Sequence, residues 1–206
     1  MPVKNIILVE GQDDRFVVIE LATAHGLTPK IDFEVKEKIQ GIEQLLRNLS
    51  YSLLEDKTLR YAVIVDADSD VLASWAKVRD RLERCGYQVP AEIEPGGVVV
   101  EGVDLPRVGV WLMPDNVNPG MLEHFLGQIV VEGDTLWPHA QQVVDSLPHR
   151  PFPASHEFKA KIHTWLAWQE EPGKPYGLAL KSGNLDPHSP NATAFVTWLK
   201  RVFEPS

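Results

Sequence analysis

Apolar residues follow two different periods along the first two thirds of the chain. Short uninterrupted apolar runs predict buried strands at 4–9, 31–35, 60–65 and 107–113. Between these runs, apolar residues recur at helical spacing and predict helices over 15–25, 41–55 and 71–85, with another beginning near 121. The segment 96–103 is typical of a hairpin or edge ribbon. This alternation predicts an α/β fold with a mostly parallel, Rossmann-like sheet flanked by helices.

The last third of the chain is predicted to be helical. Helices are expected over 135–147, 155–169 and 191–203, and the Pro- and Gly-rich segments 148–153, 172–177 and 183–190 are expected to be loops. A chain of 206 residues can bury one good core. We therefore predict a single domain over residues 1–206, with its core at about 1–133 and a C-terminal helical extension at about 134–206.

Composition narrows the setting of the protein. Cys85 is the only cysteine, so a disulfide framework within the chain is excluded and a reducing compartment, the cytoplasm, is expected. The apolar run near the start is too short for a signal peptide or a membrane span, so no membrane association is expected. The formal net charge of −9 argues against nucleic-acid binding through a basic surface.

Acidic residues follow three of the predicted strands. Glu10 comes after the first, Asp66 and Asp68 come after the run ending at Val65, and Asp115 comes after the strand near 107–113. Ligands of open α/β sheets bind at the carboxyl ends of the strands. If the strands at 4–9 and 60–65 are neighbours, Glu10, Asp66 and Asp68 lie within a few ångströms of each other, and Asp14 can face the same spot.

Such a cluster requires a cation or a proton. At about 5 Å and an effective dielectric near 20, each pair of negative charges costs roughly 3 kcal/mol. Oxygen ligands without histidine or thiolate partners point to Mg²⁺ or Mn²⁺ and not to zinc. Two such ions could serve phosphodiester chemistry. The alternative is that these acids form turns and helix caps, for which Asp14, Asp70 and Glu123 are well placed.

The segments Val9-Glu-Gly-Gln-Asp-Asp14 and Val65-Asp-Ala-Asp68 resemble the Toprim signature. That signature is a glutamate after the first strand and an Asp-x-Asp after a later one, shared by topoisomerases, bacterial primases and the overcoming-lysogenisation-defect (OLD) nucleases. Further along, Val110-Trp-Leu-Met-Pro-Asp-Asn116, Gly120-Met-Leu-Glu123 and the run from Lys159 to Trp168 resemble a family of short, stand-alone, uncharacterised bacterial and phage Toprim-like proteins. This wider resemblance covers most of the chain.

The resemblance implies a site with named members. It places metal at Glu10, Asp66 and Asp68, with Asp14 and Asp70 as outer or second-metal ligands, Glu123 as a downstream acid, and a lysine. Lys159 and Lys161 are the candidates for the lysine. Lys159 shares a helical face with Ile162, His163 and Leu166, whereas Lys161 lies about 200° around the helix, and this geometry favours Lys159.

The first functional hypothesis is a Mg²⁺- or Mn²⁺-dependent phosphoesterase or nuclease with nucleic acid as its substrate. Glu10, Asp66, Asp68 and Lys159 would be its catalytic residues. The resemblance to strand-transfer relatives alternatively implies a general acid or base role for Glu10. The second hypothesis is a haloacid-dehalogenase-like phosphatase with Asp66 as the nucleophile, which leaves Glu10 without a role. The third is a non-catalytic or partner-dependent regulatory subunit for nucleic-acid processing.

Overall fold

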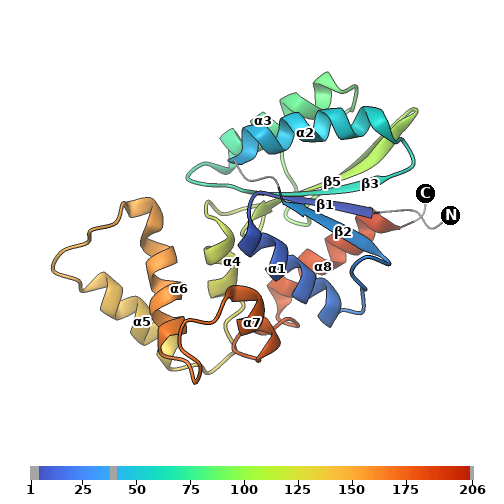
Figure 1. Ribbon diagram of the computed structural model, residues 1–206. Coiled ribbons are helices and arrows are strands. Elements are labelled where there is room, and N and C mark those ends of the chain that lie inside the picture. The colour runs from blue at the N-terminus through green and yellow to red at the C-terminus, as the bar shows by residue number, and fades with distance from the viewer. Residues whose placement is uncertain (1–4, 38–40, 205–206) are drawn as a thin grey trace.

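A computed structural model describes residues 5–37 and 41–204 of the chain (Figure 1). Its centre is a five-stranded sheet in the order β2-β1-β3-β5-β4. The strands are β1 (Asn5–Val9), β2 (Phe33–Glu37), β3 (Arg60–Asp66), β4 (Val98–Gly102) and β5 (Leu105–Met113). The helices are α1 (Gln12–Ala24), α2 (Gly41–Glu55), α3 (Val71–Arg84), α4 (Leu122–Gln128), α5 (Leu136–Asp145), α6 (Glu157–Ala167), α7 (Tyr176–Lys181) and α8 (Pro190–Phe203), with a 3₁₀ turn, η1 (Ala154–His156).

The predicted fold class is confirmed. Strands β2, β1, β3 and β5 run parallel, and β4 pairs antiparallel with β5 at one edge. Residues of β1 alternate between two cores: Ile7 and Val9 belong to one, and Ile6 and Leu8 to the other. Burial of both faces explains why the parallel strands are continuous apolar runs in the sequence.

Helices cover both faces of the sheet. Figure 1 shows α2 and α3 above it, and α1, α4 and α8 below it. Helix α8 packs against β3 and β5. It approaches closely because Gly109 of β5 has no side chain: a Cβ atom there would lie 2.1 Å from Val202. The last helix of the predicted extension is therefore part of the layer that covers the sheet.

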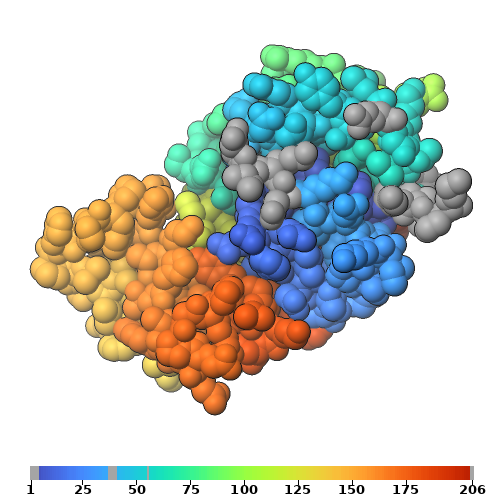
Figure 2. Space-filling view, in the orientation of Figure 1, coloured from blue at the N-terminus to red at the C-terminus, as the bar shows by residue number. Residues whose placement is uncertain are grey.

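The remaining C-terminal helices lie to one side of the sheet. Figure 2 shows the yellow and orange part of the chain standing out from the rest of the molecule. Helix α5 packs on α6, α6 on α4, and α7 on α1. No helix in residues 5–37 and 41–204 has the length and apolar character needed to cross a membrane.

Most element boundaries agree with the sequence prediction to within a few residues, and two differences matter. The second strand begins at Phe33 and not at 31, because residues 28–32 form a turn in which Lys30 has a φ of 67°. Helix α7 follows Pro175 and begins at Tyr176, inside a predicted loop. The sequence does not predict it because six residues are too few to show a helical period. Residue 4, the start of the first predicted strand, lies outside the described residues.

Candidate carboxylate site

The order of the strands brings the predicted acids to one edge of the sheet. Strands β1 and β3 are parallel neighbours, with Asn5 to Leu8 in register with Arg60 to Val63. Their carboxyl ends therefore carry Glu10 and Asp66 side by side. Oε1 of Glu10 accepts a hydrogen bond from the backbone N–H of Asp66 at 2.9 Å. This contact joins the two strand ends that the sequence singled out.

The loop between β5 and α4 is tied to the same place. The backbone N–H of Leu122 donates to Oδ1 of Asp66 at 3.0 Å. Asp68, which has a positive φ of 53°, donates its own N–H to the carbonyl of Gly120 at 2.8 Å. These two bonds fix the beginning of α4 against the end of β3, and so Glu123 in the first turn of α4 lies beside Asp66.

Asp14 enters the cluster from the first turn of α1. Helix α1 begins directly after β1, and a Cβ atom on Gly11 would lie 3.1 Å from Oδ2 of Asp14, so the glycine leaves room for this carboxylate. Burial, together with the charges of Glu10, Glu123 and Asp13, raises the pKa of Asp14 to about 7. Asp14 therefore belongs to the same electrostatic site as Glu10.

Asp66 is the most strongly perturbed carboxyl group of the cluster. Burial, together with the charges of Asp14, Glu10, Glu123 and Asp68, raises its pKa to about 9. Burial likewise raises the pKa of Glu10, although the hydrogen bond from Asp66 opposes this shift. Desolvation and like charges both disfavour the ionised carboxylate. At neutral pH Asp66 is therefore held largely in its protonated form, because its surroundings do not stabilise a further negative charge.

Glu123 and Lys159 form an ion pair at the cluster. Nζ of Lys159 lies 3.0 Å from Oε1 of Glu123, whose side chain is 5% exposed. Partial burial acts to lower the pKa of Lys159, but the charges of Glu123, Asp13 and Asp66 raise it overall. Lys161 instead pairs with Asp145 and Glu157, each at 2.8 Å. Of the two candidate lysines, the structure brings Lys159 to the carboxylates.

Asp70 has a different position. It is the N-cap of α3, and its Oδ1 accepts a hydrogen bond from the backbone N–H of Ala73 at 3.0 Å. The residue is exposed, and its charge is not among those that perturb Asp66. The structure therefore places Asp70 in the capping role that the sequence offered as the alternative.

The donor set of the cluster fits a hard divalent cation in its chemistry. All of its acidic members supply carboxylate oxygens, the ligands that Mg²⁺ and Mn²⁺ prefer. A cation would also relieve the repulsion that raises the pKa of Asp66. The residues that would hold it are Glu10, Asp14, Asp66, Asp68 and Glu123.

The oxygens do not converge on a single point. Across residues 5–37 and 41–204, no three or more histidine, cysteine, aspartate and glutamate side chains are arranged so that they could hold a metal ion as they stand. Glu10 and Asp66 each accept from a backbone N–H, and Glu123 is held through Oε1. Binding a cation would require the side chains of Glu10 and Asp66 to rotate, whereas Glu123 could meet the cation with Oε2.

Two residues of the site were missed in the sequence. The hydroxyl of Tyr176 donates to Oε1 of Glu123 at 3.2 Å and lies 3.0 Å from Nε2 of His163. Tyr176 stands in a segment predicted to be a loop, and no motif surrounds it. His163 stands out in the sequence only as a neighbour of Lys159 on a predicted helical face. Only the packing of α7 beside α6 shows that they meet Glu123.

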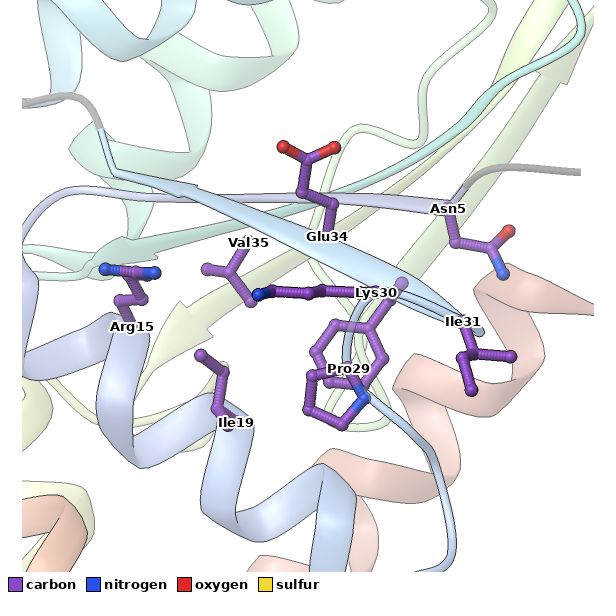
Figure 3. A pocket seen from close by; sticks show the side chains of 9 residues that line it. Asn5, Arg15, Ile19, Pro29, Lys30, Ile31, Glu34 and Val35 are labelled. Carbon is purple, nitrogen blue, oxygen red and sulfur yellow. The ribbon is translucent and has the colours of Figure 1, made fainter.

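Two cavities differ in their position relative to the carboxylate cluster. One of about 640 Å³ adjoins the cluster and is lined by Asp68, Ser69, His124, Phe158 and neighbouring residues. Another of about 330 Å³ lies between α1 and β2, where Lys30 extends beneath the strand while Glu34 points to the other side (Figure 3). The second cavity contains none of the clustered carboxylates, so only the first one offers space for a substrate of this site.

The fold and the site together define an α/β protein with an acidic site at the carboxyl ends of a mostly parallel sheet. The chain belongs to a family described as a protein of unknown function (DUF3226), whose model matches residues 4–204. Comparisons with curated proteins and with solved structures find no match.

Proposed function

We propose that this protein is a Mg²⁺- or Mn²⁺-dependent phosphoesterase that cleaves nucleic acid. The observation that carries the proposal is the meeting of five carboxylates with Lys159 at one edge of the sheet; the carboxylates are Glu10, Asp14, Asp66, Asp68 and Glu123. The proposal is supported by the resemblance of the Val9–Asp14 and Val65–Asp68 segments to the Toprim signature and to the OLD nucleases.

The chemistry follows from the residue types. Bound divalent cations supply an activated water and stabilise the leaving oxygen of a phosphodiester. The carboxylates would bind and orient the cations. Because the carboxylates are negatively charged, a phosphate would bind at this site only through the cations. Lys159 remains protonated because its pKa is raised, and it can offer positive charge to the phosphate as negative charge develops there.

Surface charge shapes the expected substrate binding. The formal net charge of −9 argues against neutralisation of a phosphate backbone mainly by a basic surface. Affinity for nucleic acid should therefore depend on the divalent cation. The cavity of about 640 Å³ beside Asp68 is open to a chain segment next to the scissile phosphate.

Cleavage of single-stranded and duplex DNA and RNA with Mg²⁺ or Mn²⁺ tests the proposal. Asp66→Asn and Asp68→Asn should each lower the cleavage rate by about 100-fold or more. Loss of a residue that only hydrogen-bonds to a metal ligand typically costs about 10–100-fold in activity, and loss of a ligand itself should cost at least as much. Lys159→Met should lower the rate, whereas the matched variant Lys161→Met should not, because Lys161 pairs with Asp145 and Glu157. Cleavage at the wild-type rate by all four variants would contradict the proposal.

The second candidate is a partner-dependent subunit. It is favoured by the hydrogen bonds that hold the carboxylate oxygens apart, because a bound partner could trigger the rotations that a cation requires. A wild type that binds Mn²⁺ but cleaves no nucleic acid would support this candidate. The phosphatase alternative with Asp66 as nucleophile is disfavoured, since a carboxyl group with a pKa of about 9 is a poor nucleophile at neutral pH.

A further inference from the structure

Glu123 is held by two donors from two different helices. Lys159 of α6 and the hydroxyl of Tyr176 of α7 both contact the same oxygen, Oε1. The side chain of Lys159 is 44% exposed, whereas Tyr176 is 2% exposed. The tyrosine is thus the fixed donor and the lysine the mobile one. Because both contacts fall on Oε1, a cation among the carboxylates would be met by Oε2.

The hydroxyl of Tyr176 carries one proton, so it can donate to only one of its two partners and must accept from the other. When this proton is donated to Glu123, the ring nitrogen Nε2 of His163 supplies an N–H to the tyrosine oxygen across 3.0 Å. The result is a chain of donors from His163 to Tyr176 to Glu123. His163 is exposed, so this chain connects the buried carboxylate with the surface.

The position of α7 depends on close packing against α1. A Cβ atom on Gly177 would lie 2.9 Å from Cβ of Phe16 and 3.3 Å from the Phe16 backbone. The glycine therefore lets α7 approach the helix that carries Asp14. A buried tyrosine hydroxyl needs a hydrogen-bond partner, and here the partner is a carboxylate of the site.

We propose that Tyr176, oriented by His163, is a positioning residue that fixes Glu123 for metal binding. This inference rests on the proposed metal-dependent function. The exposed Lys159 can turn away from Glu123 toward a phosphate, whereas the buried Tyr176 cannot. Tyr176 keeps its bond to Oε1 when Lys159 turns to the substrate, and so the carboxylate stays aimed at the cation.

The test is direct measurement of Mn²⁺ affinity by the electron paramagnetic resonance signal of free Mn²⁺. Tyr176→Phe keeps the buried ring and removes the hydroxyl, and it should weaken Mn²⁺ binding by about 10–100-fold. The double variant with Glu123→Gln should bind no more weakly than Glu123→Gln alone. Tyr87→Phe is the matched control, since Tyr87 is equally buried but donates to the carbonyl of Pro106; it should bind Mn²⁺ like the wild type.

The exposed His163 provides a second route to the same answer. His163→Gln retains an N–H donor near the position of Nε2 and should preserve Mn²⁺ affinity, whereas His163→Leu should weaken it. If Tyr176→Phe fails to fold, these two His163 variants test the positioning role of Tyr176. Equal Mn²⁺ affinities in the two variants would then overturn the proposal.

The outcomes separate the two proposals. If Tyr176→Phe folds and binds Mn²⁺ like the wild type while Glu123→Gln binds it weakly, the positioning role is overturned and the metal site stands. If the wild type itself binds no Mn²⁺ at millimolar concentration, the metal-dependent function is overturned, and the positioning role with it.

Discussion

Asp66 and Asp115 leave neighbouring strands at the same edge of the sheet. Asp66 is the last residue of β3 and is in register with Met113 of β5, and Asp115 follows β5 by two residues. Four donors surround Asp115. Its Oδ1 accepts from the N–H groups of Val117 and Asn118, and its Oδ2 accepts from the side chains of Asn118 and Gln128. Asp66 lies instead among four other carboxylates.

The two carboxyl groups have opposite electrostatic states. Partial burial acts to raise the pKa of Asp115, but the hydrogen bonds from Asn118, Gln128 and Val117 lower it overall. Burial and like charges raise the pKa of Asp66 to about 9. An acid after a buried strand is therefore a satisfied turn former in one case and a strained charge in the other. What differs is the set of elements that approaches each strand end.

The largest effect should come from adding a cation to the strained site. Mn²⁺ at 100 times its dissociation constant should raise the free energy of unfolding by about 2.7 kcal/mol. The gain at a fixed Mn²⁺ concentration should be larger at pH 8 than at pH 5.5, because protons on Asp14 and Asp66 compete with the cation at the lower pH. Thermal denaturation measures this shift. A gain that is independent of pH, or equally present in Asp66→Asn, would place the cation elsewhere.

Neutralising Asp66 should stabilise the metal-free protein. The pKa of Asp66 is higher in the folded state than in the unfolded state, so the folded state binds more protons between about pH 4 and pH 9, and the stability contribution falls as pH rises through this range. Asp66→Asn should therefore raise the free energy of unfolding by about 2 kcal/mol at pH 8, with the difference shrinking toward pH 4. Urea denaturation across pH measures it, and a destabilised variant at pH 8 would show that the charge of Asp66 is not strained.

The same substitution at the other strand end should have the opposite sign. Asp115→Asn removes a carboxylate whose lowered pKa contributes stability at neutral pH, and this contribution is lost as pH falls through the folded-state pKa. We expect a loss of about 1 kcal/mol at pH 7, kept small by the partial exposure of the group. The difference from wild type should disappear in strong acid. The comparison of the two strand ends fails if Asp115→Asn is stabilising at neutral pH.

The smallest effect should come from one of the donors around Asp115. Asn118→Ala removes the exposed side-chain bond of 2.9 Å to Oδ2 and should cost about 0.5 kcal/mol. The pKa of Asp115, measured by NMR titration, should move upward toward its ordinary value. Gln128 and the two backbone N–H groups remain as donors, so the pKa should stay well below that of Asp66; a pKa unchanged from wild type would exclude Asn118 as a cause.

Local pattern determined much of the fold. Helical spacing alone predicts a helix over 41–55, which is the range of α2. Gly26 and Gly86, both with positive φ, follow the ends of α1 and α3. The apolar runs became buried strands because burial on both faces removes the need for polar positions. The strand-end acids could be named for the same reason, since a carboxylate directly after such a run is visible in the sequence.

Tertiary structure alone decided which acids and bases meet. Several contacts join residues that lie 50 or more positions apart in the chain. They are the pairing of β1 with β3, the hydrogen bonds of Asp66 with Leu122 and of Asp68 with Gly120, and the hydrogen bond from Tyr176 to Glu123. Periodicity reports how a segment is buried, but it does not report which distant segment buries it. The sequence shows Asp66 and Asp115 alike only as acids that follow predicted strands. The packing of α1 and α4 around β3 raises the pKa of the first, while hydrogen bonds satisfy the second.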